Sequence, residues 1–575
     1  MNGAEFIASH IKGQGIKRVF TFPGGTIAPL LDALVREGIE IVCARHEQGA
    51  GYMALAAARL THTPQVVMVT SGPGVTNLAT VIADAYFDST PLVAITGQVG
   101  SGDLLSGRHV RQCGFQQVET VSLMNSITKA SCRPLKPKQL EAMLENAFKM
   151  TNEGRPGPVV IDLPMDVQNA SFNGTRKKKS ERKQKLPSIP EDQLTKASEI
   201  IAHAERPVIL AGQGVIISKA VTELRSLAES RNIPVVMSLL GLGIVSGNSA
   251  LSLGFAGHTG SQYAALAIHE ADVLIVVGAR LDVRQTGTMP EQFSPRAKKI
   301  RIDVDEQELR YSRVKCHISI RADIKDFLSM LLESIKNEPT INISKWHKQI
   351  AQWKSLYPLT YKDGDDVVKP QQIINAVDQE SVNKEVIVTS GVGSHQQWSG
   401  RHFTFDYPRR IWLTSGGHGA MGYDLPSAIG AQLAHPDHLV VSFIGDGSFQ
   451  MNIQELQSVV EFETPIKIFI LDNQRLGLVS QFQLLNWHID PTTGNKSNPD
   501  FSKIAKAYGI KTFRIDKKES IKKVVRDALN HKGPALVHCI IDQHEDVLPM
   551  LLAGSTMDKM LLPTQVEVMK RNERT

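Results

Sequence analysis

Cysteine is scarce in this chain, with five residues among 575. The five, Cys43, Cys113, Cys132, Cys316 and Cys539, are odd in number, and no two of them form a C-x-x-C pair. This spacing argues against a disulfide framework and against a structural zinc site, because both need grouped cysteines. We therefore expect unpaired, buried thiols.

Long apolar runs are also absent from the sequence. No run reaches the roughly 18 residues that a membrane-spanning helix needs, and residues 1–20 lack the basic-then-apolar pattern of a signal peptide. Hydrophobic residues make up 42% of the chain and charged residues 21%, as in ordinary globular proteins. These absences predict a cytoplasmic protein that has no membrane partner.

Charge of one sign is concentrated in a single short segment. The formal net charge is +6, but seven basic residues lie within residues 176–185, and the rest of the chain is nearly balanced. No aromatic residues are interleaved with them, and no nucleic-acid-binding module is recognisable. Since Pro187 and Pro190 follow directly, we interpret the segment as a solvated linker and expect no nucleic-acid partner. The seven are Arg176, Lys177, Lys178, Lys179, Arg182, Lys183 and Lys185.

The order of short Val/Ile-rich runs, glycine-containing turns and helical periods is typical of α/β domains with parallel sheets. A chain of 575 residues is too long for one core, and the runs fall into three groups. The sequence thus predicts three doubly wound domains at 1–170, 191–345 and 369–550, joined by linkers at 171–190 and 346–368 and followed by a tail at 551–575. Strands are predicted at 18–22, 39–43, 65–70, 92–96 and 159–163; at 208–211, 235–238, 273–277 and 299–302; and at 386–389, 439–444, 466–471 and 535–541.

The strongest chemical pattern follows the apolar run at 439–444. Gly445-Asp446-Gly447-Ser448 comes directly after that run, and 25 residues separate Gly447 from Asn473 at the end of the next run. Because both segments follow parallel strands, they meet at one edge of the sheet. A carboxylate and an amide oxygen at that edge are hard ligands that suit Mg²⁺ bound to a diphosphate. Gly-Asp-Gly alone is a common turn, so the strand context and the spaced Asn carry the prediction.

This pattern matches the cofactor motif of thiamine-diphosphate enzymes, and most of the chain resembles the acetohydroxyacid (acetolactate) synthase catalytic-subunit family. The further matching segments are Phe22-Pro23-Gly24-Gly25, Arg45-His46-Glu47-Gln48-Gly49-Ala50, Thr70-Ser71-Gly72-Pro73-Gly74, Ile95-Thr96-Gly97-Gln98, Arg155-Pro156-Gly157-Pro158 and Asn473-Gln474-Arg475-Leu476-Gly477. The resemblance implies a pyrimidine-binding domain, a central FAD-binding domain and a diphosphate-binding domain. It also implies active sites at the interface of a homodimer, which can pair into a homotetramer, and a possible small regulatory subunit.

The resemblance also implies roles for individual residues. Glu47 would be the catalytic acid that gives a proton to the pyrimidine ring of the cofactor, and Gln116 would assist it. Asp446, Asn473 and the backbone carbonyl of Arg475 would hold Mg²⁺. The thiamine diphosphate contacts would be Gly25, Gly74, Gly393, His395, Gln396, Gly419, Met421, Gly447 and Ser448.

Evidence for FAD in the sequence itself is weak, because Gly212-Gln213-Gly214 is only part of a dinucleotide fingerprint. The resemblance adds further segments of a flavin site, and a flavin here would be structural, since the chemistry needs no net hydride transfer. The implied flavin contacts are Gly212, Gly214, Gly278, Arg280, Asp282, Arg284, Asp303 and Asp323.

The chain departs from the family around the expected acceptor pocket. Phe482 replaces a tryptophan and His258 replaces a methionine, while Phe115-Gln116-Gln117 replaces Phe-Gln-Glu. We predict that Phe115, His258, Arg284 and Phe482 contact substrate, and a pocket change of this size shifts discrimination by roughly 1–3 kcal/mol. Arg108, His109 and Arg111 in a nearby loop could meet an anionic acceptor, although arginines in loops are more often solvated.

We predict a thiamine-diphosphate-dependent carboligase that decarboxylates pyruvate and transfers the two-carbon unit to a 2-keto acid, giving 2-acetolactate. One alternative keeps this donor and uses a nucleotide-linked keto sugar as the acceptor. A catalytically silent regulatory relative is disfavoured by Glu47, Asp446 and Asn473. A pyruvate oxidase is disfavoured because the C-terminus carries no amphipathic membrane-binding segment.

Overall fold

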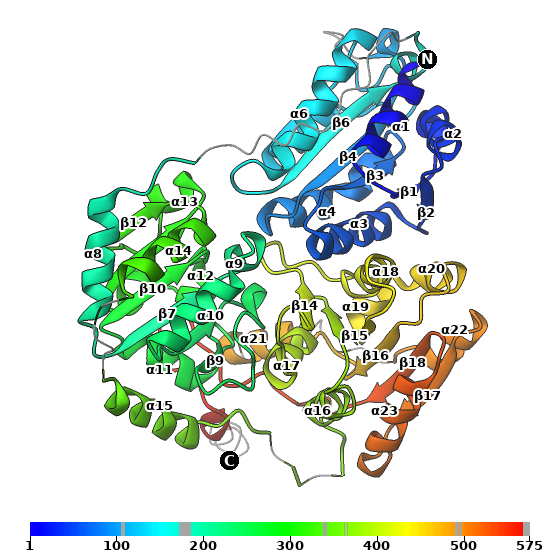
Figure 1. The fold of residues 1–575 in the computed structure, drawn as a ribbon. Helices are drawn as coiled ribbons and strands as arrows, with labels where there is room; N and C mark the ends of the chain where they lie inside the picture. Colours follow the sequence, from blue (N-terminus) through cyan, green and yellow to red (C-terminus); the bar gives the residue numbers. More distant parts are fainter. Residues whose placement is uncertain are drawn as a thin grey trace.

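The computed structural model describes residues 1–104, 110–171, 186–336, 338, 342–361, 363–364, 366–487, 489, 494 and 497–566. Figure 1 shows three α/β units, each built on one sheet of six strands. Every strand pairing within the three sheets is parallel. The predicted fold class is confirmed. The basic residues at 176–185, together with Arg108 and His109, lie outside the described residues.

The first sheet has the strand order β2-β1-β3-β4-β6-β5. Its inner strands β3 and β4 are buried at every position, as expected for parallel strands that helices cover on both faces. The strands are β1 (Arg18–Phe22), β2 (Glu40–Cys43), β3 (Gln65–Val69), β4 (Leu92–Gln98), β5 (Ala130–Cys132) and β6 (Pro158–Pro164). The helices are α1 (Gly3–Gly13), α2 (Ala28–Arg36), α3 (Glu47–Thr61), α4 (Pro73–Phe87), α5 (Thr120–Met124), α6 (Leu140–Asn152) and α7 (Met165–Asn169).

The second sheet, which forms the central domain, has the order β12-β11-β10-β7-β8-β9. The strands are β7 (Pro207–Ala211), β8 (Val235–Met237), β9 (Ser252–Phe255), β10 (Val273–Val277), β11 (Lys298–Asp303) and β12 (Ile318–Arg321). The helices are α8 (Glu191–Ala202), α9 (Gly214–Ile217), α10 (Val221–Ser230), α11 (Gln262–Glu270), α12 (Val283–Thr286), α13 (Glu306–Arg310), α14 (Ile324–Ser334) and α15 (Ser344–Leu356).

The third sheet has the order β14-β13-β15-β16-β18-β17, so the winding direction reverses between β13 and β15. The strands are β13 (Val386–Ser390), β14 (Arg410–Thr414), β15 (Leu439–Gly445), β16 (Lys467–Asp472), β17 (Lys511–Ile515) and β18 (Ala535–Ile540). The helices are α16 (Pro370–Glu380), α17 (Ser394–His402), α18 (Asp424–Ala434), α19 (Asp446–Met451), α20 (Leu456–Glu461), α21 (Gly477–Trp487), α22 (Phe501–Ala507) and α23 (Ile521–Asn530). Ligands of such sheets bind outside the strand ends at the reversal point.

Thirteen of the eighteen strands in the described part of the chain were predicted from the sequence, and the five that were missed are β5, β9, β12, β14 and β17. All five lie at a sheet edge. None of the five cysteines forms a disulfide, as expected, but only Cys539 is fully buried, and the other four are half-buried. Burial of all five was therefore predicted wrongly.

Two segments expected to be a linker and a tail contribute to the central domain. Helix α15 lies largely within the predicted linker at 346–368, and its Trp346 and Ile350 belong to a core cluster of the central domain. Leu551 and Met557, from the predicted tail, belong to the same cluster. The described residues include no helix long and apolar enough to cross a membrane.

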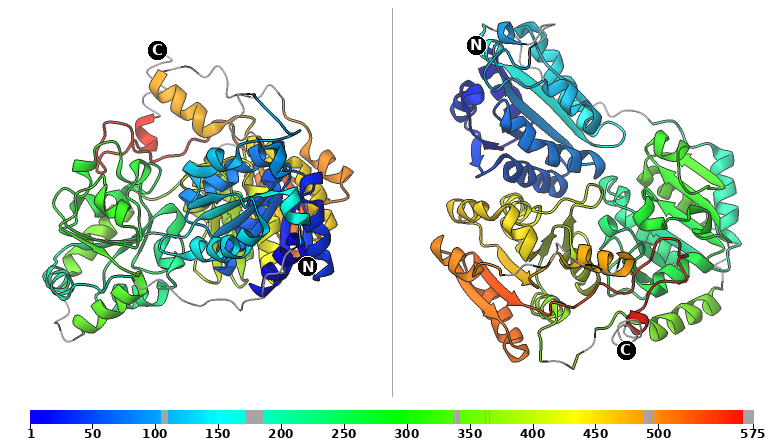
Figure 2. Two further views of the ribbon diagram at one scale, coloured as in Figure 1. Left: turned by 90° about the horizontal axis from the view of Figure 1, so that it is seen from above. Right: turned by 180° about the vertical axis from the view of Figure 1, so that it is seen from behind.

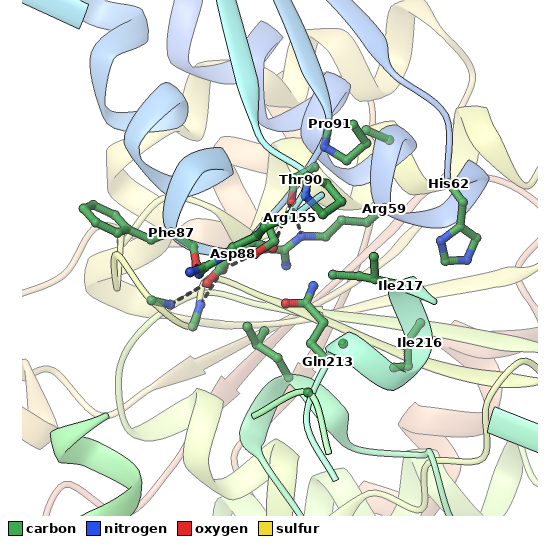
Figure 3. Close-up of a pocket in the computed structure, with 18 of the residues that line it drawn as sticks. Arg59, His62, Phe87, Asp88, Thr90, Pro91, Arg155, Gln213, Ile216 and Ile217 are labelled. Atoms are coloured by element: carbon green, nitrogen blue, oxygen red, sulfur yellow. Dashed lines mark hydrogen bonds and ion pairs between the residues drawn. The ribbon is translucent and has the colours of Figure 1, made fainter. Parts of the chain in front are cut away.

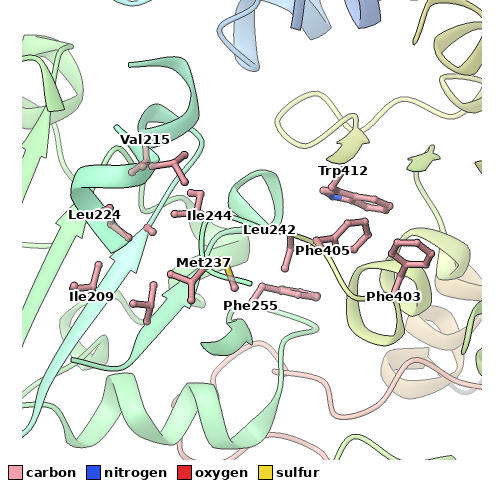
Figure 4. Close-up of a cluster of buried hydrophobic side chains, with 14 of the residues drawn as sticks. Ile209, Val215, Leu224, Met237, Leu242, Ile244, Phe255, Phe403, Phe405 and Trp412 are labelled. Carbon is pink, nitrogen blue, oxygen red and sulfur yellow. The ribbon is translucent and has the colours of Figure 1, made fainter. Parts of the chain in front are cut away.

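The third unit packs on each of the other two through apolar contacts. In Figures 1 and 2 the first unit lies against the third, and the central unit lies beside both. Helices α3 and α18 cross so closely that a side chain at Gly430 would collide with the backbone of Met53. The central unit meets the third where Leu242 and Phe255 approach Phe405 (Figure 4). These interfaces hold the candidate site residues in place.

Candidate active site

Polar groups of Asp446, Asn473 and Arg475 converge where β15 and β16 end. Asp446 is the first residue of α19, directly after β15, and Asn473 follows β16. One end of the Asn473 side-chain amide lies 3.3 Å from Asp446 Oδ1 and 2.8 Å from the Arg475 carbonyl oxygen, and with its nitrogen at that end the amide donates to both. With the amide oxygen at that end, the three oxygen atoms are arranged to share one cation. The arrangement fits the predicted Mg²⁺ site.

The donor set of this cluster leaves room for a diphosphate. It supplies one carboxylate, one amide oxygen and one carbonyl, whereas Mg²⁺ takes six oxygens. Asn498 braces the carboxylate by donating from Nδ2 to Asp446 Oδ2 at 2.7 Å and to Asp472 Oδ1 at 2.7 Å. Among the described residues, no group of three or more His, Cys, Asp or Glu side chains could hold a metal. A cation at Asp446 would therefore need further oxygens from phosphate or water.

The predicted diphosphate contacts surround this cluster at the reversal point of the sheet. His395 and Gln396 are in the first turn of α17, after β13, and Ser448 is in the first turn of α19. A side chain at Gly393 or at Gly445 would collide with the Nδ1–Cε1 edge of the His395 ring, so both glycines make room for the imidazole. A Cβ at Gly447 would lie 2.6 Å from Leu476 Cδ2 and 3.5 Å from Met421 Cε. The structure therefore places these predicted residues together.

A loop between β14 and α18 carries Gly419 and Met421. Gly419 has a positive φ of 78°, which favours glycine, and its N–H donates to Ser415 Oγ at 3.1 Å. Asp88 of the first unit holds the start of this loop, because its carboxylate accepts from the N–H groups of Gly416 at 2.8 Å and Gly417 at 2.7 Å.

Arg59 holds Asp88 in the position from which it accepts these hydrogen bonds. Its guanidinium lies 2.7 Å from Asp88 Oδ2 and donates to the Thr414 carbonyl at 2.6 Å. Both side chains of the ion pair are almost fully buried. Neither residue was predicted, since an Arg and an Asp 29 positions apart give no signal in the sequence.

The predicted site residues of the first unit lie near the strand ends of the first sheet. Glu47 is the first residue of α3, its side chain is 6% exposed, and Oε2 accepts from Asn77 Nδ2 at 3.0 Å. Gly74 is adjacent, since a Cβ there would lie 3.6 Å from Glu47 Oε1. Gln116 packs against Gly72 and has a positive φ of 63°. Gly25 is exposed at the end of β1.

Within one chain, Asp446 begins α19, whereas the neighbours of Glu47 contact residues just beyond the other end of that helix. The residues flanking Glu47 contact the end of that helix and the turn beyond it. Gln48 Oε1 accepts from Asn452 Nδ2 at 2.9 Å, and the Arg45 N–H donates to Glu455 at 3.0 Å. Asp446 begins the helix, whose six residues span about 9 Å.

A cavity of about 1900 Å³ lies between the three units (Figure 3). Arg59, Asp88 and Arg155 come from the first unit, and Gln213 and Ile216 face them from the central unit. Seven of the eight predicted flavin residues line it, namely Gly214, Gly278, Arg280, Asp282, Arg284, Asp303 and Asp323. Gly212 is not among the lining residues, although its N–H donates to the Val277 carbonyl at 2.8 Å.

Some flavin candidates also have local structural roles. The Asp282 carboxylate caps α12, and the Asp323 carboxylate caps α14. Burial raises the pKa of Asp303, and a hydrogen bond from the Asp305 N–H partly opposes the rise. A side chain at Gly278 would meet Gly214 Cα at 2.7 Å, so the two glycine turns touch. That close approach leaves backbone rather than side chains at this wall of the cavity.

The four predicted substrate contacts separate into two pairs. His258 and Arg284 both line the cavity, and the His258 N–H donates to the Arg284 carbonyl at 2.5 Å. Burial, together with the charges of Arg284 and Arg401, lowers the pKa of His258 to about 4, so the ring is neutral near pH 7. Phe115 and Phe482 do not line the cavity and are 84% and 46% exposed. The described structure does not bring all four together.

Comparison with known proteins decides the family. Residues 1–123 match the N-terminal TPP binding domain of thiamine pyrophosphate enzymes, residues 194–331 the central domain, and residues 391–539 the C-terminal TPP binding domain. The chain is 39% identical to acetolactate synthase isozyme 1 large subunit of Escherichia coli (strain K12), over 97% of each chain. The chain belongs to the acetolactate synthase family. It is therefore a thiamine-diphosphate-dependent enzyme.

Other members of the acetolactate synthase family align with similar completeness. Isozyme 2 large subunit of Escherichia coli (strain K12) is 37% identical over 98% of this chain and 99% of its own. The probable acetolactate synthase large subunit of Methanocaldococcus jannaschii is 38% identical over 99% of this chain and 96% of its own. The resemblance deduced from the motifs is confirmed over nearly the whole length.

Proposed function

We propose that this enzyme decarboxylates one pyruvate and joins the remaining two-carbon unit to a second 2-keto acid, giving 2-acetolactate and CO₂. The observation that carries this proposal is that Asp446, Asn473 and the Arg475 carbonyl meet where β15 and β16 end, in a chain whose relatives are named acetolactate synthases. Bound thiamine diphosphate supplies the electron sink for the decarboxylation.

The residues of the chain provide binding, orientation and one proton. Asp446, Asn473 and Arg475 hold the metal, while His395 and Ser448 serve the diphosphate. Glu47 is placed to exchange a proton with the pyrimidine ring, and its nearly complete burial keeps water away from that proton. His258, which is neutral near pH 7, and Arg284 border the space where an acceptor carboxylate could bind.

The proposal predicts that pyruvate alone is a sufficient substrate. Full-length protein with thiamine diphosphate and Mg²⁺ is incubated with ¹³C-pyruvate, and NMR is expected to show 2-acetolactate and CO₂ in equal amounts. A parallel reaction adds a CDP-linked keto sugar. If product forms only when the sugar is present, the 2-keto acid is not the acceptor. The named relatives give no support to that alternative.

We also propose that two copies of the chain build each active site. In this arrangement the Glu47 of one copy faces the cofactor that Asp446 of the other copy holds, as the resemblance to the family implies. The exposed apolar side chains of α21, Val479, Phe482, Leu484 and Trp487, lie just beyond Asn473 and suit burial in such an assembly. Since related proteins are named large subunits, a smaller regulatory partner is a further proposal.

We propose that FAD occupies part of the interdomain cavity in a structural role. The cavity exceeds the 300–1,000 Å³ of ordinary ligand pockets, and glycine turns and Arg280 line it. Purified protein is expected to release FAD on denaturation, measured by absorbance. Arg280→Ala removes a cation suited to phosphate and is expected to weaken retention about tenfold. Arg296→Ala, an exposed change in the same domain, is the control. Wild-type protein free of flavin would contradict the proposal.

A further inference from the structure

Asp424, the first residue of α18, lies at the reversal point of the third sheet. Its side chain is 1% exposed, and its carboxylate is hydrogen-bonded on both sides of that point. On the β13 side, the Gly391 N–H donates to Oδ1, and His395 Nε2 lies 3.2 Å from the same oxygen. On the β15 side, the Ser448 hydroxyl donates to Oδ2. One buried carboxylate therefore contacts two residues assigned to the diphosphate.

We propose that Asp424 is a positioning residue that orients His395 and Ser448 toward the cofactor diphosphate. The inference rests on the proposed cofactor site. A carboxylate can only accept, so the His395 proton on this side must be on Nε2. The opposite edge of the ring, with Nδ1, lies against Gly393 and Gly445 at the ends of the two strands. Without Asp424, a ring between two glycines could turn over and exchange its two edges.

The surrounding contacts show that this geometry is built into the fold. A side chain at Gly391 would collide with the Asp424 carboxylate, so only glycine fits there. Ser448 Oγ also accepts from the Gly422 N–H at 2.8 Å, which directs its proton to Asp424. Thr389 Oγ1 donates to the Asp424 carbonyl at 3.2 Å and fixes the start of α18. With Nε2–H held toward Asp424, the Nδ1 edge of His395 is kept at the ends of the two strands.

The test measures the affinity of full-length protein for thiamine diphosphate and for thiamine at fixed Mg²⁺, by tryptophan fluorescence quenching. Asp424→Asn is expected to weaken thiamine diphosphate binding about 10- to 100-fold, the range typical of residues that orient ligand-binding side chains. Binding of thiamine, which lacks the diphosphate, is expected to stay the same. The ratio of the affinity for thiamine diphosphate to the affinity for thiamine should therefore fall by the same factor.

A double-mutant cycle tests the route of the effect. Asp424→Asn in a His395→Ala background is expected to add much less than it does in wild type, because the two residues act as one unit. The matched control is Asp378→Asn, which removes another largely buried carboxylate of this unit, one that pairs with Arg410. That control should lower the melting temperature without changing the diphosphate preference. It also shows how much of any change in thiamine diphosphate affinity comes from lost stability alone, should Asp424→Asn be less stable than wild type.

Three outcomes would overturn the inference while wild type still binds thiamine diphosphate. The first is an unchanged preference of Asp424→Asn for thiamine diphosphate over thiamine. The second is a double variant with His395→Ala whose loss of affinity equals the product of the two single losses. The third is tighter binding of thiamine diphosphate by Asp424→Asn. The last would mean that the carboxylate repels the diphosphate rather than arranging its ligands. Failure of wild type to bind thiamine diphosphate would instead contradict the proposed function itself.

Discussion

Asp446→Ala is expected to abolish Mg²⁺-dependent binding of thiamine diphosphate under ordinary assay conditions. The change removes the one carboxylate of the converging oxygen cluster and leaves the amide of Asn473 and the carbonyl of Arg475. Loss of a charged metal ligand is worth about 3 kcal/mol or more, which corresponds to a weakening of roughly 100-fold. Titration with thiamine diphosphate at several Mg²⁺ concentrations, followed by calorimetry, measures the loss.

Asp437→Asn is the control for charge. Asp437 is exposed between α18 and β15 in the same unit, so its loss changes the net charge without touching the cluster. Binding should match wild type. If Asp446→Ala kept the Mg²⁺ dependence of wild type, the metal would be held elsewhere and the assignment of this cluster would be wrong.

Glu47→Gln is expected to lower kcat by roughly 100- to 10,000-fold, the usual contribution of a positioned acid or base. Glutamine keeps the size of the side chain and an oxygen that can accept from Asn77, but it has no acidic proton to give. Affinity for thiamine diphosphate should change little. Hydrogen–deuterium exchange at C2 of the bound cofactor, followed by NMR after rapid quenching, separates the loss of activation from later steps.

Glu40→Gln provides the matched control, since Glu40 is an exposed glutamate of β2 paired with Arg18. C2 exchange as fast in Glu47→Gln as in wild type would refute the catalytic role of Glu47.

Mixing the two inactive variants, Glu47→Gln and Asp446→Ala, tests whether each active site takes residues from two chains. A hybrid dimer of Glu47→Gln and Asp446→Ala chains contains one intact site if the residues come from different chains. About a quarter of wild-type activity is then expected after random exchange. No recovery is expected if both residues act within one chain.

The inner strands could be predicted from sequence because their environment leaves a simple pattern. Strands such as β7 and β10 are buried at every position and appear as continuous apolar runs. The missed strands lie at sheet edges, where β17 has exposed positions and β5 is only half-buried, so their sequences are mixed. β14 is an exception, since it is fully buried but begins with Arg410. That guanidinium is buried because Asp378 of α16 pairs with it.

The two halves of the candidate site differ in how far sequence could describe them. The pairing of Asp446 with Asn473 was predicted because each residue directly follows an apolar run, and parallel strands bring such positions to one edge. Asp424 and Asp88 gave no comparable signal. Asp424 lies at the start of a helix and contacts residues 29 and 24 positions away, while Asp88 contacts backbone N–H groups of another unit. Contacts of this kind exist only after the units have packed.

By itself, the sequence determined the three parallel-sheet units, the family and the segments that meet at the metal cluster, because periodicity and strand-end motifs are local properties. The tertiary structure decided which side chains support those motifs. It joined His395 and Ser448 through Asp424, and it held the loop between β14 and α18 with Arg59 and Asp88. It also placed Glu47 toward the far end of α19 from Asp446. The physical reason is that hydrogen bonds between distant residues depend on how whole helices and sheets pack, and no short segment of sequence specifies that packing.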